Sequence, residues 1–189
     1  MVSSERPVAV PRIKTERLVL RGLTEADIPF VFEHFSKSEI NEYSSAENLS
    51  SIEEARQLYV KYIAPRPQLF RLGMVLDETG KLVGTLGFYG IDHGNATAVV
   101  GVDLMKKCWG RGLMGEALDA LVDYGFREMR LNRIEATVDP ENVRCLRLMD
   151  RCGFRREGVL REKYYYKSKF HDDIILSILK SEWIMERRR

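Results

Sequence analysis

The chain has 189 residues, enough to bury a core without disulfides or metals, and its 44% hydrophobic and 31% charged residues are typical of a globular protein. A net charge of +2 gives no argument for nucleic acid as a direct partner, and no apolar run reaches the roughly 18 residues of a membrane span. Three cysteines, Cys108, Cys145 and Cys152, form no Cys-x-x-Cys pair. We therefore expect free thiols, no metal, no membrane partner and a cytoplasmic location.

The first half of the chain is predicted from short patterns of apolar and polar residues. Residues 1–11 contain two prolines and small polar residues, which indicates a flexible leader before one domain over residues 12–189. Residues 24–27 (Thr-Glu-Ala-Asp) form a capping-box pattern, which predicts the start of a helix. The expected elements are a strand at 16–21, that first helix, a helix at 50–62, strands at 69–76 and 81–91 joined by a turn, and a strand at 97–104.

The second half begins with a long amphipathic helix, whose apolar residues recur at every third or fourth position after Leu113. The remaining expected elements are a strand at 133–138, a helix at 141–151, and strands at 154–166 and 171–183. The order β-α-α-β-β-β-α-β-α-β-β predicts an α/β (α+β) fold, with a mixed, mostly antiparallel sheet flanked by helices. Strands 97–104 and 133–138 should be parallel, joined by a right-handed crossover.

The stretch "CWGRGLMGEALDAL" (108–121) contains Gly-x-Gly-x-x-Gly, the spacing of a dinucleotide-binding loop. Five residues separate its first glycine, Gly110, from the preceding strand, and too few strands follow for a dinucleotide-binding sheet. A P-loop is excluded because Glu116 stands where a lysine should follow Gly115. Glycines that only let a helix pack closely on a sheet are a further alternative. Glycines at a helix N-terminus expose backbone N–H groups and the positive end of the helix dipole, so the pattern favours a phosphate site.

Together with three other segments, this stretch resembles the GNAT superfamily of acyl-CoA-dependent N-acetyltransferases over nearly the whole chain. The family's pyrophosphate loop reads Gln/Arg-x-x-Gly-x-Gly/Ala, and "WGRGLM" (109–114) departs from it at Trp109 and Met114. Tryptophan at that place, followed by the pair Glu116-Ala117, is similar to the branch that acetylates the N-terminal alanine or serine of ribosomal proteins. The other segments are "TERLVLRGLTEADI" (15–28), "DPENVRCLRLMDRCGF" (139–154) and "FHDDIILSILKSEW" (170–183).

The resemblance implies acetyl-CoA as the co-substrate and no metal. Backbone N–H groups of the glycine loop would hold the CoA pyrophosphate, and the end of the preceding strand would pair with the pantetheine arm. Asn142 would lie beside the pantetheine, or would only cap the helix that begins after Pro140. The residues expected to bind the cofactor are Asp103, Leu104, Met105, Gly110, Arg111, Gly112, Leu113, Met114, Gly115 and Asn142.

Acetyl transfer from a thioester needs a neutral amine, stabilisation of the oxyanion and a proton for the departing thiolate. In the family a backbone N–H near Leu104 meets the oxyanion. Glu135 and Asp103 are the carboxylates best placed by strand position to act as general base, although a solvated or salt-bridged role explains each equally well. An α-amino group, with a pKa of about 7.7–8.0, would need only a mild base, whereas a lysine near 10.4 is almost wholly protonated.

The general acid has weaker candidates. Many relatives place a tyrosine seven residues after the asparagine, and here that residue is Met149. Relatives in the N-terminal branch often have serine three residues after it, and here it is Cys145, our candidate acid. A buried hydrophobic role is the alternative for this cysteine. Side chains with less support are Tyr164, Tyr165 and Tyr166, which are typical of strand packing, and His34, His93 and His171.

The sequence thus predicts an N-acetyltransferase that modifies a primary amine, with a protein N-terminal α-amino group of ribosomal type as the first choice. One alternative is a small-molecule amine such as a polyamine, an antibiotic or an amino acid. An alternative of another class is a non-catalytic acyl-CoA-binding module, because Met149 replaces the tyrosine. Either a monomer or a homodimer fits the sequence. Four glutamates in and after the first helix would suit a polycationic substrate: Glu33, Glu39, Glu42 and Glu47.

Overall fold

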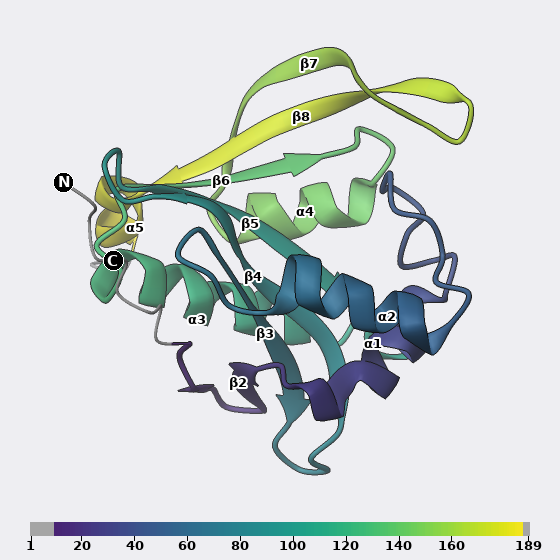
Figure 1. Ribbon diagram of the computed structural model, residues 1–189. Helices are drawn as coiled ribbons and strands as arrows, with labels where there is room; N and C mark the ends of the chain where they lie inside the picture. The colour runs from purple at the N-terminus through teal and green to yellow at the C-terminus, as the bar shows by residue number, and fades with distance from the viewer. Residues whose placement is uncertain (1–9, 187–189) are drawn as a thin grey trace, which may run out of the picture.

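Eight strands form one sheet in the computed structural model, which describes residues 10–186 (Figure 1). All neighbouring strands are antiparallel except one pair, β5 and β6, which are parallel as the crossover rule predicts. The predicted mixed, mostly antiparallel sheet is confirmed. In their order across the sheet the strands are β1 (Ile13–Lys14), β2 (Leu18–Gly22), β3 (Leu69–Leu76), β4 (Leu82–Asp92), β5 (Thr97–Leu104), β6 (Arg133–Val138), β8 (Lys169–Leu179) and β7 (Arg155–Tyr166).

The predicted helices are present, with shifts at their ends. The capping box before the first helix is formed, because the Asp27 carboxylate accepts the backbone N–H of Thr24 at 2.8 Å. The second helix ends earlier than expected and continues as a π-helical turn at Tyr59–Ile63. Among the described residues the α-helices are α1 (Ile28–Phe35), α2 (Ile52–Leu58), α3 (Leu113–Arg127), α4 (Val143–Arg151) and α5 (Lys180–Glu186).

The predicted end of the last strand is wrong. The last strand was expected over 171–183, but β8 ends at Leu179 and α5 begins at Lys180. The backbone N–H of Leu179 donates to the Glu182 carboxylate at 3.1 Å, which supports the helical turn. The helix places the buried Trp183 ring against Phe126 of α3, with 5.5 Å between ring centroids. Tertiary packing here overrides the alternating pattern.

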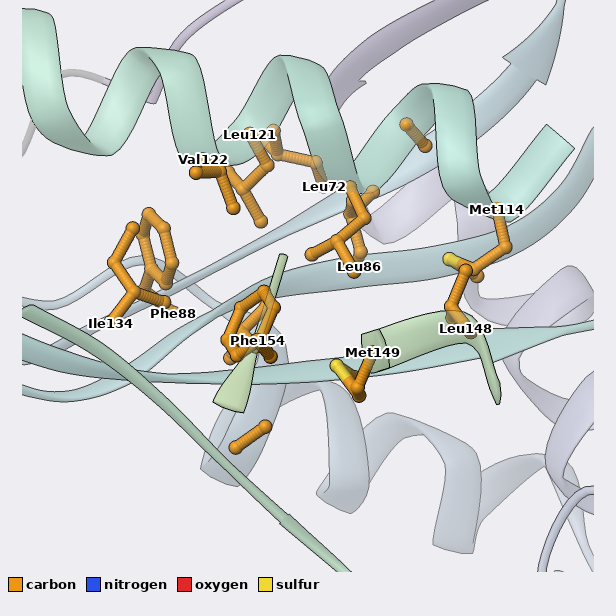
Figure 2. Close-up of a cluster of buried hydrophobic side chains, with 14 of the residues drawn as sticks. Leu72, Leu86, Phe88, Met114, Leu121, Val122, Ile134, Leu148, Met149 and Phe154 are labelled. Atoms are coloured by element: carbon orange, nitrogen blue, oxygen red, sulfur yellow. The ribbon is translucent and has the colours of Figure 1, made fainter. Parts of the chain in front are cut away.

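The main core lies between the sheet and the pair α3 and α4. Figure 2 shows Met114 of α3 beside Leu148 of α4, with Met149 in the same cluster. The helix α3 lies very close to the strands, since a Cβ atom on Gly125 would be 3.0 Å from the ring of Phe88. The predicted buried face of α3 is confirmed by its fully buried residues, which include Leu113, Ala117, Leu118, Leu121 and Val122.

Helices α1 and α2 cover the opposite face of the sheet, around a second cluster that includes Val31 and Ala55. Between these layers β5 and β6 pair only over Thr97–Val99 and Arg133–Glu135. Beyond these residues the two strands separate, while each keeps its other neighbour, β4 or β8 (Figure 1). The sheet is therefore split at the carboxyl ends of its only parallel pair in the described chain, and the split opens toward α1 on one face and α4 on the other.

Residues 1–9, most of the predicted leader, lie outside the described residues, and the division into leader and one domain stays a prediction. Within residues 10–186, no helix combines the length and the apolar character needed to cross a bilayer.

Candidate active site

A cavity of about 800 Å³, called the main cavity below, lies where β5 and β6 separate. One wall is formed by residues 100–104 of β5, and another by the end of β6 and the start of α4. The glycine loop before α3 closes one end, and the segment after α1 reaches it from the other face of the sheet. The side chains that line this cavity include Glu39, Tyr89, Thr137, Asp139, Asn142, Cys145 and Met149.

The glycine loop has the geometry of an anion site. Gly110 and Gly112 have φ angles of +73° and +77°, in the left-handed region that glycine adopts without strain. Gly112 is the N-cap of α3, and the first helical hydrogen bond is donated by the N–H of Glu116. Within residues 10–186 no hydrogen-bond acceptor meets the six backbone N–H groups from Gly110 to Gly115. Such a row of free donors at the positive end of a helix dipole fits a pyrophosphate.

Arg17, the residue directly before β2, holds this loop in place. Its guanidinium donates to the Glu116 carboxylate at 2.7 Å and to the backbone carbonyl of Arg111 at 2.9 Å. Thr15 adds a hydroxyl donor to the same carboxylate at 2.5 Å. Burial opposes the charge on Glu116, but the hydrogen bonds from Thr15 and Arg17 outweigh it and lower its pKa. The negative charge of Glu116 is therefore compensated by Arg17 rather than left facing an anion.

Trp109, a departure from the family's loop pattern, has a clear structural role. Its indole N–H donates to the backbone carbonyl of Leu104 at 2.7 Å, and the guanidinium of Arg144 lies over its ring at 4.0 Å. The N–H of Met105 donates to the Val83 carbonyl at 2.8 Å. Two of the backbone groups expected to pair with pantetheine thus have partners within the protein. The pairing of residues 103–105 with that arm stays a prediction.

Asn142 serves as a helix cap and also lines the cavity. Its side-chain oxygen accepts the backbone N–H of Cys145 at 3.1 Å at the start of α4, so the capping alternative is confirmed. Cys145 lies in the first turn of α4 and also lines the cavity. Burial raises the pKa of its thiol to about 11. A thiol that holds its proton more tightly than an ordinary thiol, with a pKa near 8.5, is a poorer donor to a thiolate, which weakens the case for Cys145 as general acid.

Asp103 lies in a buried ion-pair cluster on the α1 face of the sheet. Its carboxylate accepts from His34 Nε2 at 2.5 Å, from the Thr85 hydroxyl at 2.7 Å and from the guanidinium of Arg71. Burial disfavours the charge, yet Arg71 and His34 outweigh it and hold the pKa of Asp103 well below its usual range. A carboxylate stabilised in this way is a weak proton acceptor, and its contacts match the salt-bridged alternative for this residue.

Glu135, the other candidate base, points into a different ion-pair network. Arg133 donates to the Glu135 carboxylate at 2.6 Å and also binds Glu157 and the hydroxyl of Ser177. Glu135 pairs with Val99 at the level where β5 and β6 are still joined, below the split, and it does not line the cavity. The structure thus brings Asn142, Cys145 and the glycine loop to one cavity, and separates Glu135 from them.

A cluster that the sequence interpretation missed surrounds Asp139, at the end of β6. The Asp139 carboxylate accepts from the Tyr166 hydroxyl at 2.6 Å, from His171 Nδ1 at 3.0 Å and from the backbone N–H of Glu141 at 2.8 Å. The rings of Tyr166 and His171 stack, with centroids 3.6 Å apart. Burial opposes the charge, but these hydrogen bonds lower the pKa of Asp139. The only sequence signal was an aspartate directly after a strand and before the asparagine.

Met149 is buried in the main core and lines the cavity, so no hydroxyl stands at that position. Of the three histidines, His34 and His171 are buried against carboxylates, and His93 lies in the turn after β4. Within the described part of the chain, no cluster of three or more histidine, cysteine or acidic side chains could hold a metal ion.

A sheet split between two parallel strands, with a free anion cradle at the split, is the architecture of a CoA-dependent acyltransferase. The model of the acetyltransferase (GNAT) domain family matches residues 17–155, and the chain belongs to this family. It is an N-acetyltransferase that uses acetyl-CoA.

Relatives and solved structures agree with this assignment. The chain is 34% identical to the "Uncharacterized N-acetyltransferase p20" of Bacillus licheniformis, over 89% of this chain and 96% of that protein. It is 31% identical to the "Putative ribosomal N-acetyltransferase YdaF" of Bacillus subtilis, over 61% of this chain and 62% of that protein. The crystal structure of spermidine N-acetyltransferase from Vibrio cholerae, in complex with CoA and spermine, superposes with a TM-score of 0.80 at 25% identity, over 89% of this chain and 98% of that one.

The residues of this chain suit the task of holding acetyl-CoA, which supplies an activated acetyl thioester when bound. The free N–H groups of Gly110 to Gly115 would hold its pyrophosphate, and the separated edge of β5 would accommodate the pantetheine arm. The wall formed by Asn142 and Cys145 would limit the space beside that arm. The rest of the cavity, toward α1, is left for the amine.

Proposed function

We propose that the acceptor is a small-molecule primary amine that carries further positive charge, such as a polyamine. The observation that carries this proposal is the carboxylate of Glu39, which lines the main cavity on the segment after α1. Glu39 and Glu33 also line a second cavity, of about 430 Å³, but Lys37, Lys106 and Lys107 line it too, so the proposal rests on the main cavity alone. A cavity wall with carboxylates favours a cationic ligand. The remaining glutamates contribute less, because Glu42 lies 3.5 Å from the guanidinium of Arg144 and Glu47 is exposed.

The relatives support the same class of amine. The Vibrio cholerae enzyme that shares this fold is a spermidine N-acetyltransferase by name, and its structure contains CoA and spermine. The similarity to YdaF keeps a protein N-terminal α-amino group as a second candidate. The three free cysteines are consistent with a cytoplasmic enzyme, which stays our expectation.

The test follows the release of the CoA thiol with three acceptors: spermidine, a monoamine of similar length, and peptides that begin with serine or alanine. We expect spermidine to give a kcat/KM at least about tenfold above the others, the effect of about 1.4 kcal/mol of charge recognition. Glu39→Gln should lower kcat/KM for spermidine and leave the monoamine nearly unchanged. Glu78→Gln, in the exposed turn before β4, is the matched control. A preference for the peptides would overturn the polyamine proposal in favour of the second candidate.

A further inference from the structure

Four carboxylates of the described residues line the main cavity, and arginine neutralises only two of them. Arg71 binds Asp103 on β5, and the Arg156 guanidinium lies 3.0 Å from the Asp150 carboxylate on α4. In the described part of the chain, no lysine or arginine forms an ion pair with the other two. Those two are Glu39, on which the proposed function rests, and Asp139, directly after β6.

The side chain of Asp139 lies on the face of the sheet that α1 covers. Val99 of β5 is paired with Glu135 of β6, so these two side chains share a face. Alternation along each strand then puts Asp103 and Asp139 on that same face, one on each side of the split. Asp103 contacts His34 of α1, which identifies the face. We expect the amine on this face, since α3 and α4 cover the other.

Three donors orient the Asp139 carboxylate and leave part of it free. One oxygen accepts the Tyr166 hydroxyl at 2.6 Å and His171 Nδ1 at 3.0 Å, and the other accepts the backbone N–H of Glu141 at 2.8 Å. A carboxylate offers about four lone-pair sites, so the second oxygen can accept one more donor. The hydroxyl and the backbone N–H are neutral, and a neutral histidine ring with its hydrogen on Nδ1 also donates. These bonds therefore hold the carboxylate without requiring a cation.

The cations that line the same cavity belong to α4. They are Arg144, Arg147 and Arg151. The Arg144 guanidinium lies 4.0 Å over the ring of Trp109, beside the glycine loop, and Arg151 is in the last turn of the helix. All three are thus on the side of the sheet where the glycine loop would hold the CoA phosphates. Among the described residues that line the cavity, no lysine or arginine lies on the α1 face, where Asp139 is.

We propose that the Asp139 carboxylate binds the ammonium nitrogen that is to be acetylated, at the split between β5 and β6. An alkylamine has a pKa near that of lysine, about 10.4, so it reaches the cavity as a cation and loses part of its hydration there. A carboxylate with a free lone pair supplies a charged partner and fixes the direction of one N–H bond. Only 8% of Asp139 is exposed, so little water competes for this contact.

Asp139 is a binding group here and not the base. Burial opposes its charge, but the hydrogen bonds from Tyr166, Glu141 and His171 outweigh burial and lower its pKa. A carboxylate with a lowered pKa stays ionised and takes up a proton weakly, which suits an ion that must remain negative beside a cation.

The two carboxylates without an arginine partner have different places in the cavity. Asp139 lies at the split, where the thioester would lie, and Glu39 lies on the segment after α1. Asp139 would therefore meet the reacting nitrogen of every acceptor, and Glu39 a second charge in the acceptors that have one. This assignment needs only acetyl transfer to an amine, whichever amine is preferred.

The test measures KM and kcat for spermidine and for a monoamine of similar length, at saturating acetyl-CoA. Asp139→Asn should raise the KM of both amines at least about tenfold, the loss expected for one hydrogen bond to a charged group. The KM for acetyl-CoA should stay within about twofold and kcat within about threefold, because the ground-state contact with the ammonium is what is lost. Asp139→Glu keeps the charge and should recover part of the loss. Glu39→Gln should by contrast affect spermidine alone.

Asp172→Asn is the matched control, since Asp172 is next to His171 on β8 and accepts the backbone N–H of Glu162 at 2.8 Å, outside the cavity. It should keep every KM within about twofold. Melting temperature and CoA affinity check that each variant is folded. If Asp139→Asn does not fold, Asp139→Ser replaces it, because a serine hydroxyl can also accept the N–H of Glu141 and keep the turn.

The assignment is wrong if the folded Asp139→Asn or Asp139→Ser protein keeps the KM of both amines within about threefold, or if the KM for acetyl-CoA rises by the same factor. A loss confined to spermidine would also contradict it, because Asp139 would then bind a distant charge and not the reacting nitrogen. A wild-type enzyme that acetylates only peptides would overturn the polyamine proposal, and the same comparison of KM values would then be made with the peptide.

Discussion

Arg17 and Glu116 are 99 residues apart in the chain, yet the guanidinium of one lies 2.7 Å from the carboxylate of the other. Glu116 is in the first turn of α3, directly after the row of free N–H groups. The negative charge of its carboxylate interacts favourably with the positive end of the helix dipole, but it would repel the pyrophosphate. Arg17 neutralises it and at the same time binds the carbonyl of Arg111 in the loop.

Arg17→Ala should therefore raise the Kd for CoA about tenfold, because it leaves Glu116 uncompensated beside an anion. The double variant Arg17→Ala with Glu116→Gln should regain part of the affinity. Isothermal titration calorimetry with CoA measures both, and Lys14→Ala, which breaks an exposed ion pair with Asp77, is the control. If the double variant binds CoA more weakly than Arg17→Ala alone, the charge argument fails.

Gly112→Glu should abolish CoA binding at concentrations where the wild type is saturated. The substitution adds a side-chain anion to the cradle and places a β-carbon at a φ of +77°, which costs about 1–2 kcal/mol by itself. Gly112→Ala isolates that backbone cost. Acetyl-pantetheine, a thioester without the pyrophosphate, should lose much less activity with Gly112→Glu than acetyl-CoA does. Retained CoA affinity in the folded glutamate variant would show that this loop does not hold the pyrophosphate.

Asp103→Asn should destabilise the fold by about 3–5 kcal/mol, because it leaves Arg71 and His34 without their carboxylate partner. The pKa of Asp103 is lowered in the folded protein, so its stabilising effect is full above the unfolded value of about 3.9 and is lost as pH falls through the folded value. Urea unfolding at neutral and acid pH measures this. Asp77→Asn, from an exposed pair, should cost less than about 1 kcal/mol. Equal losses for the two variants would contradict a special role of the cluster.

Cys145→Ala should change kcat by less than about threefold, since a thiol with a pKa raised to about 11 is a poor proton donor. Cys145→Ser is the companion variant, because a hydroxyl could replace a donating thiol. Steady-state kinetics with saturating acetyl-CoA measure both. A loss of about tenfold or more with alanine, recovered with serine, would restore Cys145 as the general acid.

Local patterns were enough to place most elements. The strands Leu69–Leu76, Thr97–Leu104 and Arg133–Val138 have the predicted bounds, because alternation of apolar residues reports directly on a strand's two faces. The glycine loop was also recognisable from the sequence, because a left-handed backbone at the start of a helix favours glycine whatever surrounds it. Residues 180–183 were wrongly assigned to the last strand, because the packing of Trp183 on α3, and not the local pattern, makes this segment helical.

The roles of the carboxylates could not be predicted in this way. Asp103, Glu135 and Asp173 all lie on strands, and position along a strand does not say which acid meets an arginine. The first two are paired with Arg71 and Arg133, while Asp173 is buried, which raises its pKa. These partners are set by strand register and by the point where β5 and β6 separate.

The sequence by itself determined the family, the order of the elements and the anion loop, because each depends on residues close together in the chain. Tertiary structure alone decided which carboxylates are neutralised, where the cavity opens and which hydroxyls reach it. The physical reason is that a side chain's charge state depends on its burial and on its nearest partners, and in this protein those partners come from strands and helices far apart in the sequence.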